Sequence, residues 1–587
     1  MKMKEMGEKR GNEDELLMKL EEISHRGWFL WKIFLFCTIP SILNGLNLTS
    51  YIYLAEVPQH WCSVPELKSA NWTEEEIRNV SSPGGGEKSS CFFYQWDYSM
   101  LASMTYEDAL SYVQSNKLPS VKPCSGYSYA EGISSMVVDY DLVCDRIALK
   151  STIQMTLSLG KFAGAFFFGI ISDKYGRRLS FLVGSFLYII SGPMVSFAVN
   201  YGMIIAGRIG LGAAGSAIYH SAYVILIEIV DKNKRASLST LYNMSYPIGQ
   251  MIVPLIAYFI RDWRELQLVI SVPALMTLFF YWLLPESPRW LISSGKRAEA
   301  ARFINKFYTE EMKKKFEAKM KLKAESSPVP ARKPLDCEES LELPLQNITD
   351  SAKTEDPPSP LRGLWLKLTA ALKQFVELVR HSELRNRLFI TLFAWCVCSL
   401  SYYALALNVD NFHTNRYIYG FLTGLVEVPS YLLPLPLLKY LGRRYTSIPL
   451  FYVGGVALVG ILMIPRTPEY NIFLLVVASI GRLCTSAVFA VVILHSTELF
   501  PTLVRNTAIG LGSTAAHIGS MSAPFLVDLL GAYAWFIPST VCGMATLIAG
   551  TCIFLLPETK NKPLPDTIQD IVNAPKESKL GFHQICS

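Results

Sequence analysis

Two of the ionisable side chains inside apolar stretches of this chain, those of His517 and Glu427, are candidates for a chemical role. His517 lies in GLGSTAAHIGSMSAPF, at 510–525, and Glu427 lies in FLTGLVEVPSYLLP, near a proline that can open a helix. An ionisable residue within a membrane helix is a functional candidate by default, because its charge is costly in hydrocarbon. We expect Glu427 to contact a substrate or a proton; the alternative is a buried structural hydrogen bond.

His517 can carry or lose a charge in the physiological pH range. A neutral ring leaves Glu427 as the main charge nearby and favours organic cations. A protonated ring offsets Glu427 and can hold the carboxylate of a zwitterion. The alternative is a packing histidine that forms a hydrogen bond with Ser513 or Ser520 on its own helix.

Aromatic residues supply the second kind of chemistry. Trp395 and Tyr402, in WCVCSLSY, are seven residues apart and therefore share one face of a helix. A cation over an aromatic ring gains roughly 0.5 to 2 kcal/mol, which suits a site that must also release its ligand. Phe489 is a weaker candidate of the same kind. The alternative for this stripe is packing or contact with lipid.

The elements that carry these residues are predicted membrane spans. Of the 587 residues, 51% are hydrophobic and 18% charged, a composition unusual for a soluble protein of this size. A span needs roughly 20 apolar residues, and no cleaved signal peptide precedes the first one. The sequence predicts an all-α polytopic membrane protein with twelve spans, at about 30–52, 151–171, 179–199, 203–226, 239–260, 266–285, 387–408, 417–439, 447–464, 472–495, 507–530 and 533–556.

Charged loops set the predicted orientation. Residues 54–148 hold 13 acidic and 6 basic residues, whereas residues 289–387 hold 20 basic ones. The excess of lysine and arginine places the second segment and both termini in the cytoplasm, so the net charge of +6 reports topology and not a nucleic-acid partner. The expected order is a cytoplasmic N-terminus at 1–28, helix one at 29–53, an external loop at 54–148, helices two to six at 149–286, a cytoplasmic linker at 287–386, helices seven to twelve at 387–556 and a cytoplasmic tail at 557–587.

The external loop carries cysteines and two glycosylation sequons. Four cysteines in an oxidising compartment allow two disulfides with three connectivities, with free thiols as the alternative. N-x-S/T sequons are acceptors for N-glycans in such a loop. The residues concerned are Cys62, Cys91, Cys124 and Cys144, with Asn71 and Asn79.

Short sequence motifs of the first six-span half recur in the second half at similar intervals. GRR at Gly176 recurs at Gly442, an interval of 266 residues, and Pro-Glu at Pro285 recurs at Pro557, an interval of 272. A repeat on this scale indicates two homologous bundles. Parallel halves related by an axis along the membrane normal place a substrate site between them at the midplane.

Charged residues gather at the cytoplasmic end of both halves. We expect them to form a network that latches the halves in one conformation, with direct substrate contact as the alternative. Two arginines inside spans, Arg208 and Arg482, should instead pair with helix carbonyls or with a partner acid. The network consists of Asp173, Lys174, Arg177, Arg178, Glu228 and Arg235 in the first half and Arg443, Arg444, Glu498 and Arg505 in the second.

Several motifs resemble one known family. LVCDRIALKSTIQMTLSLGKFAGAFFFGIISDKYGRR, PESPRWLISSGKRAEA, STELFPTLVRN and LLPETKNKPLPDTI are similar to segments of the major facilitator superfamily and, within it, of the organic cation, organic anion and carnitine transporters. The resemblance covers about residues 28–570. It implies a twelve-helix transporter of the plasma membrane that carries small organic ions by alternating access.

The resemblance also implies which residues line the pocket. It assigns Trp395, Tyr402, Glu427, Asn243 and Tyr246 to substrate contacts. In this family a helix-eleven position contributes to charge preference, with aspartate typical of cation carriers and arginine of anion or carnitine carriers. His517 occupies that position, so the charge of the substrate stays open.

We therefore expect a plasma-membrane secondary transporter for small organic cations or amine-bearing zwitterions, such as quaternary ammonium, carnitine-like or biogenic-amine-derived solutes. An organic anion exchanger is the alternative, and a scaffold or sensor is the non-transporting one. Motifs for ATP binding, zinc hydrolysis and serine hydrolysis are absent from the sequence, which argues against an enzyme. We expect a small organic ion, the lipid bilayer and a coupling proton or sodium ion as partners, with no cofactor, metal or nucleic acid.

Overall fold

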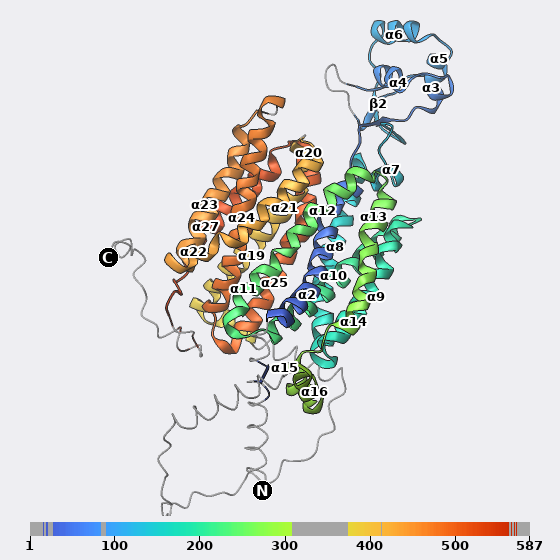
Figure 1. Ribbon diagram of the computed structural model, residues 1–587. Helices are drawn as coiled ribbons and strands as arrows, with labels where there is room; N and C mark the ends of the chain where they lie inside the picture. The colour runs from blue at the N-terminus through green and yellow to red at the C-terminus, as the bar shows by residue number, and fades with distance from the viewer. Residues whose placement is uncertain are drawn as a thin grey trace, which may run out of the picture.

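The chain forms two bundles of helices, with a small domain attached above one of them (Figure 1). This computed structural model describes residues 27–83, 90–307, 374–412, 414–465 and 467–562, with a few single positions near the chain ends. The predicted N-terminal segment, most of the linker between the halves and most of the tail lie outside the described residues. We call the end of the bundles that bears the small domain the domain side, and the opposite end the linker side.

The first bundle contains six spans. Several of them are composites, because prolines and polar residues interrupt the helical hydrogen bonding; the fifth predicted span, for example, is divided at Met244. The elements are α2 (Gly27–Leu54), α8 (Ile147–Tyr175), α9 (Arg177–Ser196), α10 (Tyr201–Ile229), α11 (Lys232–Asn243) with α12 (Ser245–Phe259), and α13 (Trp263–Ser271) with η2 (Val272–Leu275) and α14 (Met276–Leu283).

The second bundle repeats this arrangement. Its elements are α19 (Ser382–Leu407), α20 (Val409–Phe412), α21 (Arg416–Leu432) with α22 (Pro434–Tyr440), α23 (Arg443–Gly460) with η3 (Ile461–Met463), η4 (Pro468–Tyr470), α24 (Asn471–Leu499), α25 (Thr502–Phe525) with the π-helix η5 (Leu526–Leu530), α26 (Gly531–Tyr533) and α27 (Ile537–Ile553).

Within the described residues, nine helices are long and apolar enough to cross a membrane, and α27 is a shorter apolar helix. The other two predicted spans, at 239–260 and 507–530, correspond to the divided pair α11 and α12 and to α25 with η5. Large apolar side chains such as Phe259 and Met463, each 82% exposed, lie on the outside of the bundles. Such exposure is stable when lipid covers it.

Close helix contacts fix the bundles. A Cβ on Gly160 of α8 would come 2.2 Å from the carbonyl oxygen of Ile209 on α10, so only glycine permits this approach. Gly176 and Gly442 have φ of +109° and +91°, a region that favours glycine. They make the same sharp turn after α8 and after α22. The halves meet where α12 packs on α21 and α8 packs on α25.

The small domain lies between α2 and α8 and contains the cysteines. Its strands form two antiparallel pairs, with Trp61 opposite Ser128 and Phe93 opposite Lys122. Its own core includes Leu67, Ile77 and Leu101. The elements are β1 (His60–Cys62), α3 (Pro65–Ser69), α4 (Glu74–Ser81), β2 (Phe92–Tyr94), α5 (Tyr98–Ala102), α6 (Tyr106–Ser115), β3 (Val121–Pro123), β4 (Tyr127–Tyr129), α7 (Met136–Asp139) and η1 (Cys144–Arg146). On the linker side, α15 (Pro288–Ser293) and α16 (Arg297–Phe307) follow the first bundle.

Candidate functional site

A buried ion pair lies where the two halves meet. Oε2 of Glu427 on α21 is 3.0 Å from Nη2 of Arg482 on α24, and the two side chains are 1% and 2% exposed. Tyr402 donates a hydrogen bond to Oε1 of Glu427 at 2.8 Å, and Tyr431 donates to the same oxygen at 3.2 Å. Nε2 of Gln250, on α12 of the first half, donates to Oε2 at 2.9 Å. The carboxylate of Glu427 is therefore neutralised within its own half and hydrogen-bonded across the interface.

Arg482 finds both kinds of partner predicted for it. Its Nη1 donates to the carbonyl of Tyr402 at 2.6 Å, and its guanidinium lies 4.2 Å from the centroid of the Tyr402 ring. Arg208, the related residue on α10, is 0% exposed. None of its three guanidinium nitrogens has a hydrogen-bond partner among the described residues, so the partner predicted for Arg208 is not found there.

Tyrosines surround the Glu427 cluster. Tyr246 interacts electrostatically with Tyr402, Tyr403 and Glu427. The hydroxyl of Tyr219 donates to Oδ1 of Asn243 at 2.7 Å, and Tyr219 also interacts with Tyr246. The structure thus gathers four predicted site residues, Asn243, Tyr246, Tyr402 and Glu427, into one neighbourhood.

Trp395 lies apart from this neighbourhood. Its indole N–H donates to Oγ of Ser496 at 2.8 Å, and its ring meets Phe489 edge-on with 5.8 Å between centroids. Two helical turns, roughly 10 Å along the axis, separate Trp395 from Tyr402. Their seven-residue spacing places the two residues on one face of α19, two helical turns apart, each with its own set of contacts.

His517 packs against the first half. Its ring centroid lies 5.5 Å from that of Phe162 on α8, and it interacts electrostatically with Lys161 and His220. Ser520 donates its hydrogen bond to the backbone carbonyl of His517, at 2.9 Å, and not to the ring. The ring hydrogen bond considered from the sequence is thus not formed among the described residues.

On the domain side, ion pairs that sequence reasoning missed join the two halves. Nζ of Lys150 on α8 lies 2.9 Å from Oδ1 of Asp528 and 3.7 Å from Oδ2 of Asp410. Ser151 donates to Oδ2 of Asp528 at 2.8 Å, and Tyr51 donates to the same atom at 3.3 Å. In the sequence, the sign of this pair was the aspartate Asp528 inside the apolar run at 507–530.

A second connection on the domain side reinforces the first. Nη1 of Arg416, which begins α21, lies 2.9 Å from Oε2 of Glu56, which follows α2. The hydroxyl of Tyr53 donates to the carbonyl of Arg416 at 3.1 Å. The halves are therefore held together at this end by charges and hydrogen bonds.

On the linker side, the described pairs of the predicted network stay within the first half. Arg177 lies 3.4 Å from Asp173 and 3.1 Å from Glu228. The backbone N–H of Arg177 donates to Oε1 of Glu286 at 2.9 Å. Lys174 contacts the ring of Tyr175, 5.0 Å from its centroid. These contacts close the turn between α8 and α9 and do not latch one half to the other.

The second half repeats this motif. Arg443 lies 2.7 Å from Glu498, and its backbone N–H donates to Oε1 of Glu558 at 2.9 Å. Burial alone would raise the pKa of the Glu558 carboxyl, but hydrogen bonds from the backbone N–H groups of Arg443, Arg444, Thr559 and Lys560 lower that pKa. Arg505 donates to the carbonyl of Phe500 at 3.3 Å, whereas the Arg444 guanidinium lies over an aromatic ring. In the sequence, the Pro-Glu repeat marks Glu286 and Glu558. Their role in accepting hydrogen bonds from the first backbone N–H groups of α9 and α23 was not predicted.

The ion pairs of Arg177 and Arg443 therefore each lie within one half and do not form the predicted latch between the halves.

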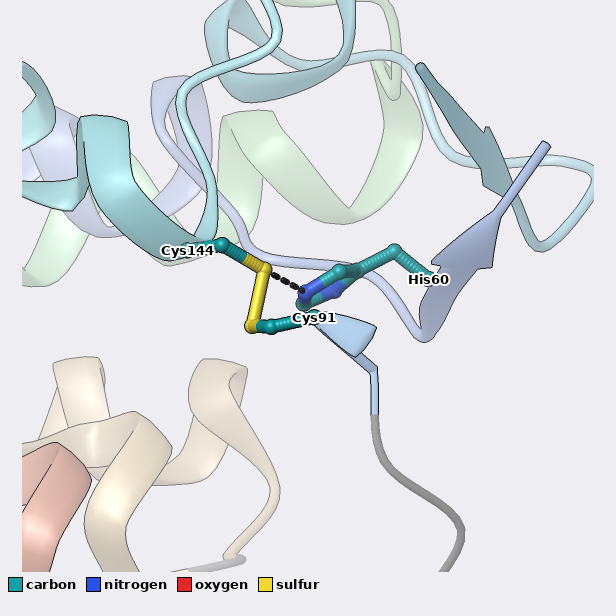
Figure 2. A group of neighbouring side chains, drawn as sticks. All are labelled: His60, Cys91 and Cys144. Carbon is teal, nitrogen blue, oxygen red and sulfur yellow. Dashed lines mark hydrogen bonds between the residues drawn. A yellow bond between two sulfur atoms is a disulfide. The ribbon is translucent and has the colours of Figure 1, made fainter. Parts of the chain in front are cut away.

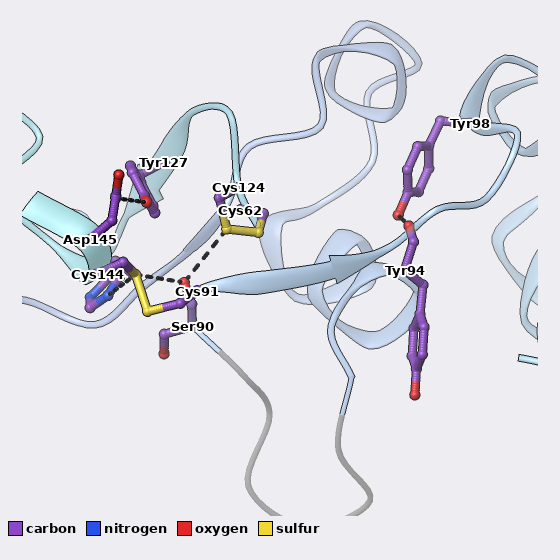
Figure 3. Close-up of a disulfide and its surroundings, with 10 residues drawn as sticks. Cys62, Ser90, Cys91, Tyr94, Tyr98, Cys124, Tyr127, Cys144 and Asp145 are labelled. Atoms are coloured by element: carbon purple, nitrogen blue, oxygen red, sulfur yellow. Dashed lines mark hydrogen bonds between the residues drawn. A yellow bond between two sulfur atoms is a disulfide. The ribbon is translucent and has the colours of Figure 1, made fainter. Parts of the chain in front are cut away.

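The cysteines of the small domain form two disulfides, Cys62 with Cys124 and Cys91 with Cys144, which lie side by side at its base (Figure 3). Nε2 of His60 lies 3.8 Å from Sγ of Cys144 (Figure 2). His60, Cys91 and Cys144 lie close together, but the two cysteine sulfurs form a disulfide, so neither is a thiolate that could hold a metal ion.

The two sequon asparagines differ in their surroundings. Asn71 is exposed and has a φ of +59° in the turn after α3. Asn79 is half-buried in α4, and its Nδ2 donates to the hydroxyl of Tyr106 at 3.1 Å. Asn71 is therefore the more accessible acceptor.

Two similar six-helix halves that meet at a buried polar site define a membrane transporter of the major facilitator fold, and not an enzyme. The profile of the "Sugar (and other) transporter" family matches residues 89–569. Together with the full-length relatives described next, this match shows that the chain belongs to that family and, within it, to the organic cation, organic anion and carnitine transporters.

Full-length relatives include the "Organic cation transporter protein" of Drosophila melanogaster, which is 30% identical over 96% of this chain and 95% of its own. The "Organic cation/carnitine transporter 2" of Homo sapiens is 30% identical over 95% of this chain and 94% of its own. "Solute carrier family 22 member 6-A" of Xenopus laevis is 31% identical over the same shares. The inward-open conformation of the xylose transporter XylE from E. coli has the same fold, with a TM-score of 0.55 and 14% identity over 91% of this chain and 98% of that one.

Proposed function

We propose that this chain is a plasma-membrane secondary transporter for small amine-bearing organic solutes, either cations or zwitterions. The observation that carries the proposal is the polar cluster around Glu427, where Gln250 of the first half reaches the second. Tyr246, Tyr402 and Tyr403 provide aromatic faces beside one carboxylate. Ring faces and a counter-charge are what replace the lost hydration of an ammonium group.

We further propose that transport proceeds by alternating access and that this structure represents the inward-facing conformation. Support comes from the Lys150–Asp528 and Glu56–Arg416 pairs, which join the halves on the domain side, whereas the linker-side ion pairs among the described residues each stay within one half. The disulfides and the sequons suit an oxidising exterior, so the domain side would face outside and the linker side the cytoplasm. A proton or sodium gradient would supply the driving force where transport is uphill.

An organic anion exchanger is the second candidate. It is favoured by the pairing of Glu427 with Arg482, which removes the free negative charge that a cation would need. It is also favoured by histidine, in place of aspartate, at position 517.

Uptake by the full chain decides between these candidates. In a low-background cell, we expect saturable uptake of carnitine or tetraethylammonium, and the same activity from purified protein in liposomes. Uptake of para-aminohippurate alone would favour the anion exchanger. If purified protein transported none of the three solutes, the amine-solute proposal would be rejected in favour of a non-transporting scaffold or sensor.

A further inference from the structure

We propose that Lys161 binds the carboxylate of the transported solute, so that the preferred substrates carry both an amine and a carboxylate. This inference rests on the proposed function and narrows it to zwitterions. Lys161 lies near the middle of α8, is 8% exposed, and directly precedes Phe162, which meets the other half.

The position of Lys161 is at the interface between the halves. Its Nζ lies 5.9 Å from the ring centroid of Tyr403, on α19 of the second half. The next residue, Phe162, packs against His517 on α25. On its own half, Ser216 of α10 donates to the backbone carbonyl of Lys161 at 2.9 Å. The lysine is thus fixed at the interface by its backbone while its ammonium faces aromatic and imidazole groups.

Lys161 has no anionic partner among the described residues, in contrast to the other buried lysine of the same helix. Lys150 has Asp528 at 2.9 Å and Asp410 at 3.7 Å. For Lys161 the structure shows no ion pair and no hydrogen bond from the ammonium, and its ionisable neighbours are His517 and His220. A buried ammonium without an anion is unfavourable. An anion that arrives with the substrate would remove that cost.

Glu427 cannot serve as this anion without leaving Arg482, because it already lies 3.0 Å from the Arg482 guanidinium. Among Lys161, Arg482 and Glu427, two positive charges therefore face one negative charge, and the charge of Lys161 remains uncompensated. Tyr403 interacts electrostatically with Glu427 and also contacts Lys161, so both charged groups lie near this one tyrosine. A bound zwitterion would place its carboxylate at Lys161 and its ammonium group near Glu427 and the surrounding tyrosines.

The internal repeat relates these two positions. Residues 161 and 427 are 266 apart, the same interval that separates the glycines of the two GRR motifs, Gly176 and Gly442. The two halves thus present opposite charges at corresponding positions. Two corresponding residues of opposite sign form the two ends of a site for a dipolar solute.

The test compares carnitine with choline, which has the same quaternary ammonium group and no carboxylate. In cells that express the full chain, Lys161→Met should raise the carnitine concentration for half-maximal uptake by about 10- to 100-fold, the usual effect of losing a hydrogen-bonded charge. Choline uptake should stay within about twofold. Lys161→Arg should keep most of the carnitine preference, and Lys439→Met, which removes an exposed lysine of α22, should change neither solute.

Equal effects of Lys161→Met on both solutes, or no effect on either, would overturn the inference. Competition in the wild type remains informative if the variant fails to reach the membrane: carnitine should compete at least about tenfold better than its methyl ester, and equal competition would also overturn it. Uptake of para-aminohippurate that depends on Lys161 would support the carboxylate site while rejecting the amine requirement of the proposed function. Transport of tetraethylammonium with no competition by any carboxylate would reject the site and leave cation transport standing.

Discussion

Breaking the Lys150–Asp528 pair should open the domain side. The two side chains are 5% and 7% exposed, so they form a buried pair, and loss of one partner of such a pair costs about 3–5 kcal/mol. In Lys150→Met, Asp528 keeps its hydrogen bonds from Ser151 and Tyr51, which places the cost at the lower end of that range. About 3 kcal/mol corresponds to a shift of roughly 100-fold in the equilibrium between the two conformations.

The assay is labelling of a new cysteine from outside the cell with an impermeant thiol reagent. Ser158 is buried and lies seven residues after Ser151, on the same face of α8, so Ser158→Cys reports access behind the pair. Lys150→Met should raise its labelling rate by up to about 100-fold. Unchanged labelling at normal surface expression would refute the reasoning.

Arg264→Met is the matched control for this assay. Arg264 and Asp139 are also 2.9 Å apart on the domain side, but both belong to the part of the chain before the linker, and they are 37% and 34% exposed. An exposed pair contributes about 0–1 kcal/mol and does not join the halves. An equal rise in labelling from Arg264→Met would show that the effect is not specific to the interface.

Three further predictions concern the buried cluster and the small domain. Glu427→Gln should abolish most uptake, because Arg482 is left buried without its anion at a cost of about 3–5 kcal/mol. The double variant, Glu427→Gln with Arg482→Gln, should recover part of the surface expression lost in the single variant. A double variant with no better surface expression than the single one would contradict the pairing. Asn71→Gln should remove a glycan and increase electrophoretic mobility, whereas Asn79→Gln should change mobility less, and the reverse order would contradict the exposure argument. Mass spectrometry of unreduced peptides should find Cys62 joined to Cys124 and Cys91 joined to Cys144, and a Cys62–Cys91 peptide would show a different pairing.

The sequence predicts the spans well, because their signal is local. Apolar runs locate the helices, and the two GRR motifs locate the turns that Gly176 and Gly442 make with positive φ. The break between α11 and α12 at Met244 was not predicted, although Pro247 lacks the N–H that would continue the helical hydrogen bonding to Asn243.

The site was harder to predict, because its contacts join helices that are distant in sequence. Glu427 was selected as an isolated acid, yet its partner Arg482 lies 55 residues later, on a different helix. Lys161 was not selected, although it also lies within an apolar run and its 266-residue interval to Glu427 was readable from the repeat. The predicted latch was assigned to the linker side, where charges are dense in sequence. The ion pairs between halves that the structure describes lie on the domain side, where single charges such as Asp528 end an apolar helix.

Contacts of the described residues attach the small domain to the first half. Asp139 accepts hydrogen bonds from Trp263 at 3.1 Å and from Arg264 at 2.9 Å, and Tyr140 donates to the carbonyl of Ala198 at 2.9 Å. Two disulfides stiffen its base, and in Figure 1 it stands above α13 of the first half. It should therefore travel with the first half as a rigid lever. A fluorophore on this domain, paired with one on α23, would convert a small rocking angle between the halves into a large change in distance, and would report each transport cycle without touching the substrate path.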